Sequence, residues 1–326
     1  MIRALTRLTL WLGTLALVFS TATGVAFAQS GRSPDFVSGT GCSSGSPTAT
    51  STSYYVSSDW NTTVQFLGRY VPKAYEEGYL ASAGSPSSCS IIIVDYHRQV
   101  YDSTNNVWEV DEGGTLEPDS WASSVAQSFI SGYSAGHTTP TIIAFGVSND
   151  NVGWATGSSL WASAGTEWAN VVDSLTPYGY TTIEGANDFE DWTYTYSNGT
   201  TWYSYGSDAE TWETYYYNAF ATKSGNYYYV ADFGDQAAYQ GLGAPYWTNA
   251  EVYDLAWGFW AGISYPEIYY SGNQIGWQQL QASYPSLWFG GVTSENGYGG
   301  SYTWLQSWQT LNNAIPNDVG AASNSI

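Results

Sequence analysis

Three acidic residues lie close together in the segment from Tyr180 to Trp192. Glu184, Asp188 and Glu190 are separated by even numbers of residues, so their side chains leave the same face of a strand that continues through them. Same-face neighbours on a strand lie roughly 6.6–7 Å apart. Two carboxyl groups at such a separation can hydrolyse a glycosidic bond, one as the general acid and the other as base, nucleophile or stabilising charge. We therefore expect Glu190 to be the general acid and Asp188 its partner, with Glu184 beside them to raise one pKa by like-charge repulsion.

The same acidic segment has two other interpretations. An Asp-x-Glu at the end of a strand often forms a turn whose carboxylates face solvent. The cluster could also bind a cation, although the sequence contains no EF-hand or comparable loop. His97 and His137 lie in different segments and have no ligand spacing with each other or with the cysteines. We expect neither a metal ion nor a cofactor.

Other polar residues follow apolar strands in the same way. Asp95 and His97 end the run Ile91 to Val94, and Asp232 ends the run Tyr227 to Ala231. Such residues can line a pocket at the carboxyl ends of the strands, or they can form helix caps and Asx turns. We include Asp95, His97 and Asp232 among the expected substrate-binding residues.

Glu267 and Tyr269 are expected in the same pocket. Glu267 has apolar neighbours, and a carboxylate buried among them needs a partner or a raised pKa. Arg69, in a similarly apolar segment, is its predicted partner. Trp192 falls in a loop just after a predicted strand, where it can stack on a sugar ring or simply cover the core. We expect Trp192 to bind substrate.

The chain alternates between segments typical of strands and segments with a helical stripe. Trp121, Val125, Phe129 and Tyr133 lie four residues apart, for example, and are followed by the apolar run 141–147. Counting a first strand at 36–42, eight strands are expected, most of them followed by a helix. The segment 63–71 is expected to be one of these strands, and the segments 102–114 and 193–207 are expected to be loops. This pattern predicts an α/β protein with one (β/α)8 TIM-type barrel over residues 35–315. A doubly wound open sheet is the alternative, although no G-x-G-x-x-G follows the first strand.

The first 28 residues have the composition of a secretory signal peptide. Arg3 and Arg7 precede an apolar run, and Ala26-Phe-Ala28 is a small-x-small cleavage site. We expect cleavage after Ala28, a secreted protein, a flexible segment at 29–34 and a polar tail at 316–326. In an exported chain the only two cysteines predict one disulfide, Cys42–Cys89. No later stretch is apolar for long enough to span a membrane.

The charge of the chain excludes some partners and favours others. Removing the leader takes away two arginines and no acidic residue, which leaves 5 basic against 28 acidic residues. A field of this sign disfavours nucleic acid and anionic membranes. Aromatic residues make up 17% of the chain, and their faces suit sugar rings. We expect a polysaccharide or cell-wall glycan as partner and a monomeric protein.

The segment Glu184 to Glu190, together with Trp202 to Asp208 and Val252 to Ile268, resembles a group of uncharacterised exported bacterial glycoside-hydrolase-like barrels. The resemblance covers roughly residues 140–295 and implies a barrel that resembles sugar hydrolases. Through Asp188-x-Glu190 alone, the chain is also distantly similar to lysozyme-type muramidase and chitinase-type barrels. Where the first has a strand-one Asp, this chain has Thr40 or Cys42.

Two functions of different classes follow from these observations. One is an exported glycoside-hydrolase-like enzyme that uses carboxylate acid/base catalysis on an extracellular polysaccharide. The other is a catalytically inactive protein of the same fold that binds glycan or a protein partner through its aromatic rim.

Overall fold

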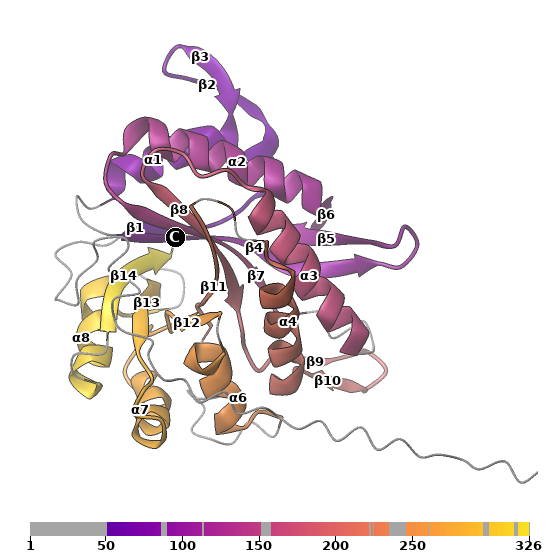
Figure 1. Ribbon diagram of the computed structural model, residues 1–326, viewed down its shortest axis with the longest axis vertical. Helices are drawn as coiled ribbons and strands as arrows, with labels where there is room; N and C mark the ends of the chain where they lie inside the picture. Colours follow the sequence, from indigo (N-terminus) through magenta and orange to yellow (C-terminus); the bar gives the residue numbers. More distant parts are fainter. Residues whose placement is uncertain are drawn as a thin grey trace, which may run out of the picture. The chain divides into compact units, whose positions relative to one another are not determined.

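The computed structural model describes residues 51–325 except 86–89, 113, 151–157, 222, 224, 235–245, 260, 296–299 and 316–318. Its central element is a ten-stranded sheet in the order β1-β14-β13-β12-β11-β8-β7-β4-β5-β6 (Figure 1). The strands are β1 (Ser51–Tyr55), β4 (Ser90–Asp102), β5 (Val107–Glu112), β6 (Thr115–Pro118), β7 (Thr141–Ser148), β8 (Thr181–Asp188), β11 (Asn226–Asp232), β12 (Gly262–Ser264), β13 (Phe289–Glu295) and β14 (Val319–Ser325).

Most neighbouring strands of this sheet are parallel. All pairs from β1 through β14, β11 and β8 to β4 run in the same direction, whereas β5 and β6 add an antiparallel hairpin to β4. β1 pairs with β14 through Ser51–Ser53 and with β4 through Tyr54 and Tyr55. The carboxyl ends of the parallel strands therefore gather at one edge, where open-sheet and closed-sheet α/β proteins alike place their sites.

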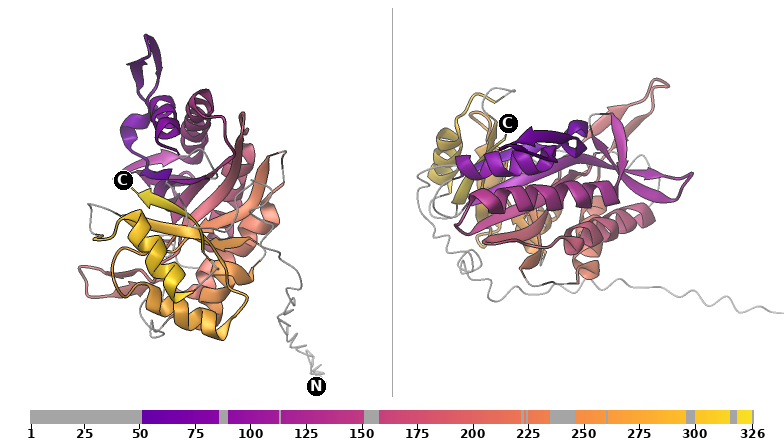
Figure 2. Two further views of the ribbon diagram at one scale, coloured as in Figure 1. Left: turned by 90° about the vertical axis from the view of Figure 1, so that its left-hand side faces the viewer. Right: turned by 90° about the horizontal axis from the view of Figure 1, so that it is seen from above.

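Helices connect the parallel strands and cover the outside of the sheet (Figures 1 and 2). They are α1 (Lys73–Gly84), α2 (Asp119–Gly136), α3 (Ser158–Ser174), α4 (Gly206–Ala219), α6 (Asn249–Tyr253), the π-helical turn η5 (Asp254–Gly258), α7 (Gln274–Ser283) and α8 (Trp304–Ala314). Thr248 and Thr303 begin α6 and α8 with complete capping boxes.

The prediction of a regular (β/α)8 barrel is wrong. The sheet is mixed and has ten strands, because the segment 102–114, expected to be a loop, continues β4 into the β5–β6 hairpin. No disulfide is found in the described part of the chain. Cys42, Cys89 and the expected first strand at 36–42 lie outside it, as do the predicted signal peptide and the segment 29–34.

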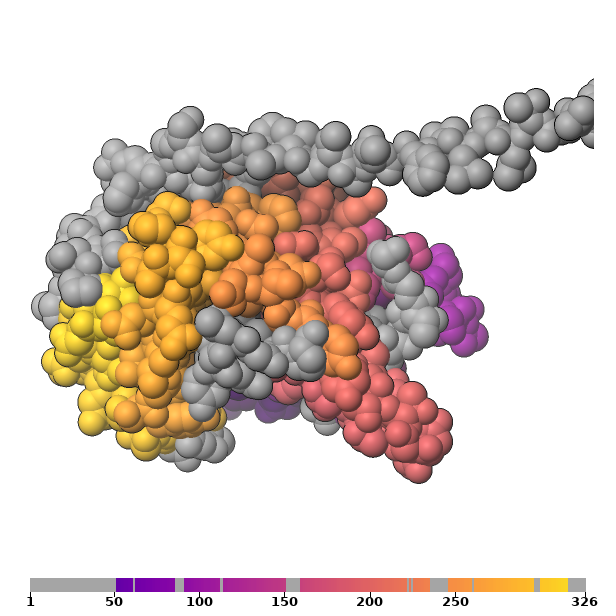
Figure 3. All heavy atoms as spheres, turned by 90° about the horizontal axis from the view of Figure 1, so that it is seen from below, coloured from indigo at the N-terminus to yellow at the C-terminus, as the bar shows by residue number. Residues whose placement is uncertain are grey.

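Other segments also differ from expectation. The segment 63–71, expected to be one strand, is the hairpin β2 (Thr63–Phe66) and β3 (Arg69–Pro72), which turns at Leu67 and Gly68 with positive φ angles. The loop expected at 193–207 contains the hairpin β9 (Thr193–Thr195) and β10 (Thr201–Tyr203), which projects from the body (Figures 2 and 3). Residues 319–325, expected in a polar tail, pair with β13 and β1.

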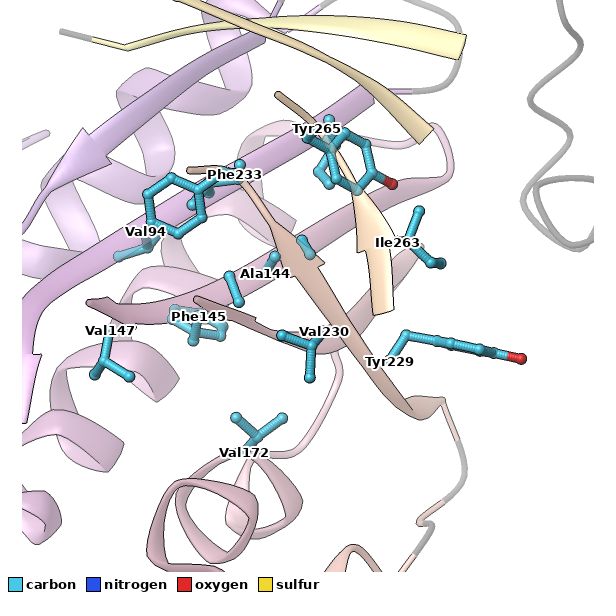
Figure 4. Packing of buried hydrophobic residues seen from close by; sticks show 14 of the residues in the cluster. Val94, Ala144, Phe145, Val147, Val172, Tyr229, Val230, Phe233, Ile263 and Tyr265 are labelled. Atoms are coloured by element: carbon cyan, nitrogen blue, oxygen red, sulfur yellow. The ribbon is translucent and has the colours of Figure 1, made fainter. Parts of the chain in front are cut away.

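The register separates the side chains of the sheet into two faces. Val147, Asn187 and Asp232 are partners across β7, β8 and β11, so they share one face. Figure 4 shows Val147, Phe145 and Val230 on the side of Val172 from α3, so this face is the one that the helices cover. The opposite, inner face carries Tyr55, Asp95, Gly146 and Ala186, which are partners across β1, β4, β7 and β8.

Paired helices approach each other closely at glycines. A Cβ at Gly165 of α3 would lie 2.0 Å from the carbonyl oxygen of Trp212 in α4, and one at Gly132 of α2 would lie 2.0 Å from that of Tyr75 in α1. Both contacts are with backbone, which cannot move without displacing the partner helix.

Gly165→Ala should therefore destabilise the fold by about 1–3 kcal/mol, because the added methyl group forces α3 away from α4. The matched control is Gly84→Ala at the end of α1, where an added Cβ meets nothing within 4 Å. Urea unfolding of both variants measures the difference. Equal stability of the two would show that the α3–α4 contact is looser than described.

Candidate functional site

A cavity of about 370 Å³ opens at the carboxyl ends of β1, β4, β7 and β8. We call it the main cavity. Its volume falls within the range that accommodates a small ligand. The described residues that line it are Tyr55, Asp95, His97, Arg98, Asp111, Gly114, Ser148, Asp150, Asp188 and Trp192.

A bulge in β4 brings Asp95 and His97 into this cavity together. β4 pairs regularly with β7 as far as Asp95, and the register then shifts before Arg98 meets Ser148. His97 lies in the bulge with φ of 58°, a conformation that costs free energy for a non-glycine residue and is concentrated at functional sites. Its backbone N–H donates to Asp95 Oδ1 at 3.1 Å.

Asp95 is almost completely buried, with 4% of its surface exposed. Burial raises its pKa well above the usual range, and the hydrogen bond from the His97 backbone only partly opposes this. The carboxyl group therefore holds a proton at a pH where an ordinary aspartate has lost it. A protonated carboxyl group in a cavity is suited to donate that proton to a ligand.

Asp188 lies on the same face at the end of β8, two strands away from Asp95. Its register partner on the intervening strand is Ser148, and strands separated by one neighbour are roughly 9–10 Å apart. Asp188 is only half-buried. The cavity thus brings together one carboxyl group in a dry setting and one in a more open setting, the arrangement that separates acid and base roles.

Asn149 fixes the chain just beyond Asp188. Its buried side-chain amide donates to the carbonyl oxygen of Glu190 at 2.9 Å and accepts from the Glu190 N–H at 3.0 Å. Ser204 donates to the same carbonyl at 2.7 Å. These bonds connect the ends of β7 and β8. Because Glu190 lies two residues after Asp188, they also restrict the position of Asp188.

Behind the main cavity lies a second one of about 20 Å³, the inner cavity. Tyr55 and Asp95 line both, and Phe233, Glu267 and Tyr269 are also in the wall of the inner one. The Tyr269 hydroxyl donates a short hydrogen bond to Glu267 Oε1. Glu267 therefore points toward the same group of residues as Asp95.

Tyr55 is the residue around which the carboxyl groups converge. Tyr55 is 40% exposed as a residue, but partial burial of its hydroxyl group raises its pKa, and the carboxyl groups of Asp95, Asp188, Glu267 and Glu295 raise it further. Its ring stacks on His97, with centroids 5.1 Å apart and planes 17° from parallel. Burial in turn lowers the pKa of His97, so the imidazole is mainly neutral at neutral pH.

Arg98 forms one wall of the main cavity and is engaged by two aspartates. Its Nε donates to Asp111 Oδ2 at 2.5 Å, its Nη2 makes a closer contact with the same oxygen, and its Nη1 lies 3.7 Å from Asp150 Oδ2. Arg98 and Asp111 are cross-strand partners on β4 and β5. The hairpin that replaces the expected loop thus supplies the partner of this arginine.

Six of the nine residues that the sequence analysis proposes for the site line the main cavity or the inner cavity. The six are Asp95, His97, Asp188, Trp192, Glu267 and Tyr269. Trp192 has a buried indole N–H with no hydrogen-bond partner among the described residues.

The other three proposed residues lie elsewhere. Asp232 is fully buried on the helix-covered face, opposite the main cavity. Glu190 follows the end of β8 and does not line either cavity. Glu184 is on the inner face but deeper, completely buried, and burial raises its pKa to about 8. The predicted Glu267–Arg69 pair is wrong, because Arg69 is exposed and its Nη2 donates to the Tyr75 hydroxyl at 3.3 Å.

Sequence reasoning misses Tyr55, Arg98, Ser148 and Asp150. Tyr55 ends a strand whose Ser51 and Ser53 are buried polar residues, so the segment lacks the apolar alternation of a strand. The signal available for Arg98 was its scarcity, since the whole chain has 7 basic residues.

Comparison with protein-family models, with curated proteins and with solved structures finds no match. Within the described ranges, no three His, Cys, Asp or Glu side chains are grouped so that they could hold a metal ion. None of the helices in the described part of the chain combines the length and apolarity needed to cross a membrane.

Proposed function

We propose that this protein is a secreted glycoside hydrolase that acts on an extracellular polysaccharide. The observation that carries the proposal is the pair Asp95 and Asp188, which face one cavity from different strands and differ in burial. Glycoside hydrolysis needs such a pair, one carboxyl group protonated and the other ionised. The resemblance of residues 184–190 to glycoside-hydrolase-like proteins agrees with this function.

In this mechanism Asp95 donates its proton to the glycosidic oxygen. The bond from that oxygen to the anomeric carbon breaks, and the leaving sugar takes the proton as a new hydroxyl group. Asp188 is the ionised partner that stabilises the positive charge developing at the anomeric carbon. A water molecule completes the hydrolysis by bonding to that carbon, and the proton it loses passes to a carboxylate of the pair. Trp192 and Tyr55 offer ring faces to the sugar from the walls of the cavity.

A protein that binds glycan without cleaving it is the second candidate. The β9–β10 hairpin and its surroundings favour it, because Tyr194 is 44% exposed and Tyr205 is 41% exposed. Tyr203 and Tyr205 both pack on Tyr246, with centroids 4.3 and 4.9 Å apart. An aromatic surface of this kind binds sugar rings whether or not the cavity is active.

Release of reducing ends from a panel of polysaccharides, including peptidoglycan and chitin, tests the proposal. We expect wild type to release ends from at least one polymer, Asp188→Asn to lose that activity and Glu190→Gln to keep it. If Glu190→Gln loses the activity and Asp188→Asn keeps it, the chemistry belongs instead to Glu190, the general acid predicted from the sequence. Binding of a polymer by all three proteins without release would establish the second candidate.

A further inference from the structure

The charged residues of the main cavity indicate which class of substrate it accepts. This inference rests on the proposed function. Among the described lining residues, the basic side chains are Arg98 and His97. Both nitrogen-bearing edges of Arg98 face aspartates, Asp111 on one side and Asp150 on the other. A substrate carboxylate would have to displace one of these aspartates to bind Arg98.

His97 does not replace Arg98 as an anion-binding group. It is stacked on Tyr55 and mainly neutral at neutral pH. A guanidinium group binds a carboxylate through two of its nitrogens, and Arg98 already uses Nε and Nη2 in this way with Asp111. The cavity therefore lacks, among its described residues, a cation available for a uronic or sialic acid.

The other polar groups of the cavity wall are mainly acceptors. Asp188 contributes a carboxylate group, Asp150 contributes one that also faces Arg98, and Ser148 contributes a hydroxyl group. Tyr55 and Trp192 add aromatic rings, which attract cations through their faces. The buried indole N–H of Trp192 lacks a partner among the described residues, and a saccharide hydroxyl oxygen would supply one.

The charge of the whole chain acts in the same direction. With 28 acidic and 7 basic residues, it attracts a polycation at long range and repels a polyanion. Carboxylates and aromatic faces in one cavity are complementary to an ammonium group. We infer that the substrate of the main cavity is a glycan with unacetylated amino-sugar units, which are cationic at mildly acidic pH.

Binding to the Asp95→Asn variant separates recognition from turnover. The probes are oligosaccharides of one length made of glucosamine, of N-acetylglucosamine and of a uronic acid. At mildly acidic pH and low salt we expect the glucosamine oligomer to bind at least about tenfold tighter than either of the others, and to lose most of this advantage at about 0.5 M NaCl. Equal or tighter binding of the acetylated oligomer would overturn the inference.

A second variant tests the part played by Arg98. Asp150→Asn removes a negative charge from the wall and one of the two aspartates that face Arg98, so the preference for the free amine should fall and binding of the uronic-acid oligomer should rise. Asp102→Asn is the matched control, because it removes the same charge at an exposed turn that does not line the cavity. If the preference for the glucosamine oligomer is the same in Asp150→Asn as in Asp102→Asn, the inference is also overturned.

The outcomes of the two proposals are distinguishable. A protein that prefers the glucosamine oligomer but releases no reducing ends would contradict the proposed function and support the amino-sugar inference. A protein that cleaves acetylated chains and binds them preferentially would do the opposite.

Discussion

Asn in place of Asp95 should lower kcat by roughly 10²- to 10⁴-fold, the usual contribution of a general acid. The carboxyl group of Asp95 is buried and keeps its proton at a pH where other aspartates are ionised. Asparagine has the same shape and can still accept the hydrogen bond from the His97 N–H, but it has no proton to transfer. The change therefore removes the proton donor and keeps the hydrogen bond that holds the side chain in place.

The pH dependence of the wild-type activity expected under this proposal gives an independent check. Because the pKa of Asp95 is raised, the group is an effective acid below that pKa, and activity should fall as the pH rises through it. Asp95→Asn should lose this alkaline limb from its residual activity. Thermal unfolding of the variant serves as the control for folding. Residual kcat within a few-fold of wild type, with the alkaline limb intact, would exclude Asp95 as the acid.

Gln in place of Glu184 should stabilise the protein at alkaline pH and not at acidic pH. Glu184 is completely buried, and neither carboxyl oxygen has a hydrogen-bond partner among the described residues. Burial raises its pKa from the usual 4.5 to about 8. Below 4.5 the group is protonated in both the folded and the unfolded chain, so it has no effect on the pH dependence there.

Between these two values the folded protein keeps a proton that the unfolded chain has released. The free energy of unfolding therefore falls by about 1.4 kcal/mol for each pH unit and levels off above the folded pKa. Relative to wild type, Glu184→Gln should gain about 4–5 kcal/mol at pH 8, as an upper estimate, and almost nothing near pH 4.

Urea unfolding at pH 4, 6 and 8 measures this difference. Glu117→Gln removes the same charge from a half-buried position on edge strand β6 and is the control for the general effect of reducing the acidic charge. If the gain from Glu184→Gln is the same at all three pH values, the carboxyl group is not the source of the pH dependence.

The helices and the apolar strands could be predicted from the sequence because their patterns are local. The stripe from Trp121 to Tyr133 lies within α2, and the apolar run 141–147 is all but the last residue of β7. The positions of Asp95 and Asp188 follow from the same patterns, because Asp188 ends β8 and Asp95 ends the regularly paired part of β4 before its bulge.

The elements that were missed depend on partners far away in the sequence. β1 contains buried Ser51 and Ser53, and its hydroxyl groups bond the backbone of β4, with Ile93 N–H donating to Ser53 Oγ at 3.0 Å. A strand that satisfies its polar side chains in this way cannot be recognised from hydropathy. Glu190 was misplaced because β8 ends at Asp188, and the chain then buries Phe189 against Trp212.

The place of β1 in the sheet also determines the order in which the chain can fold. Three of its residues pair with Ser323 to Ser325 at the far end of the sequence. Contacts between such distant segments impose the largest loop-closure entropy in the molecule, and they slow folding in general. β1 therefore stays incompletely paired until residues 323–325 have been synthesised. The end of β1 at the main cavity, Tyr54 and Tyr55, pairs with β4 and can form early, so the sheet around the cavity does not depend on β14.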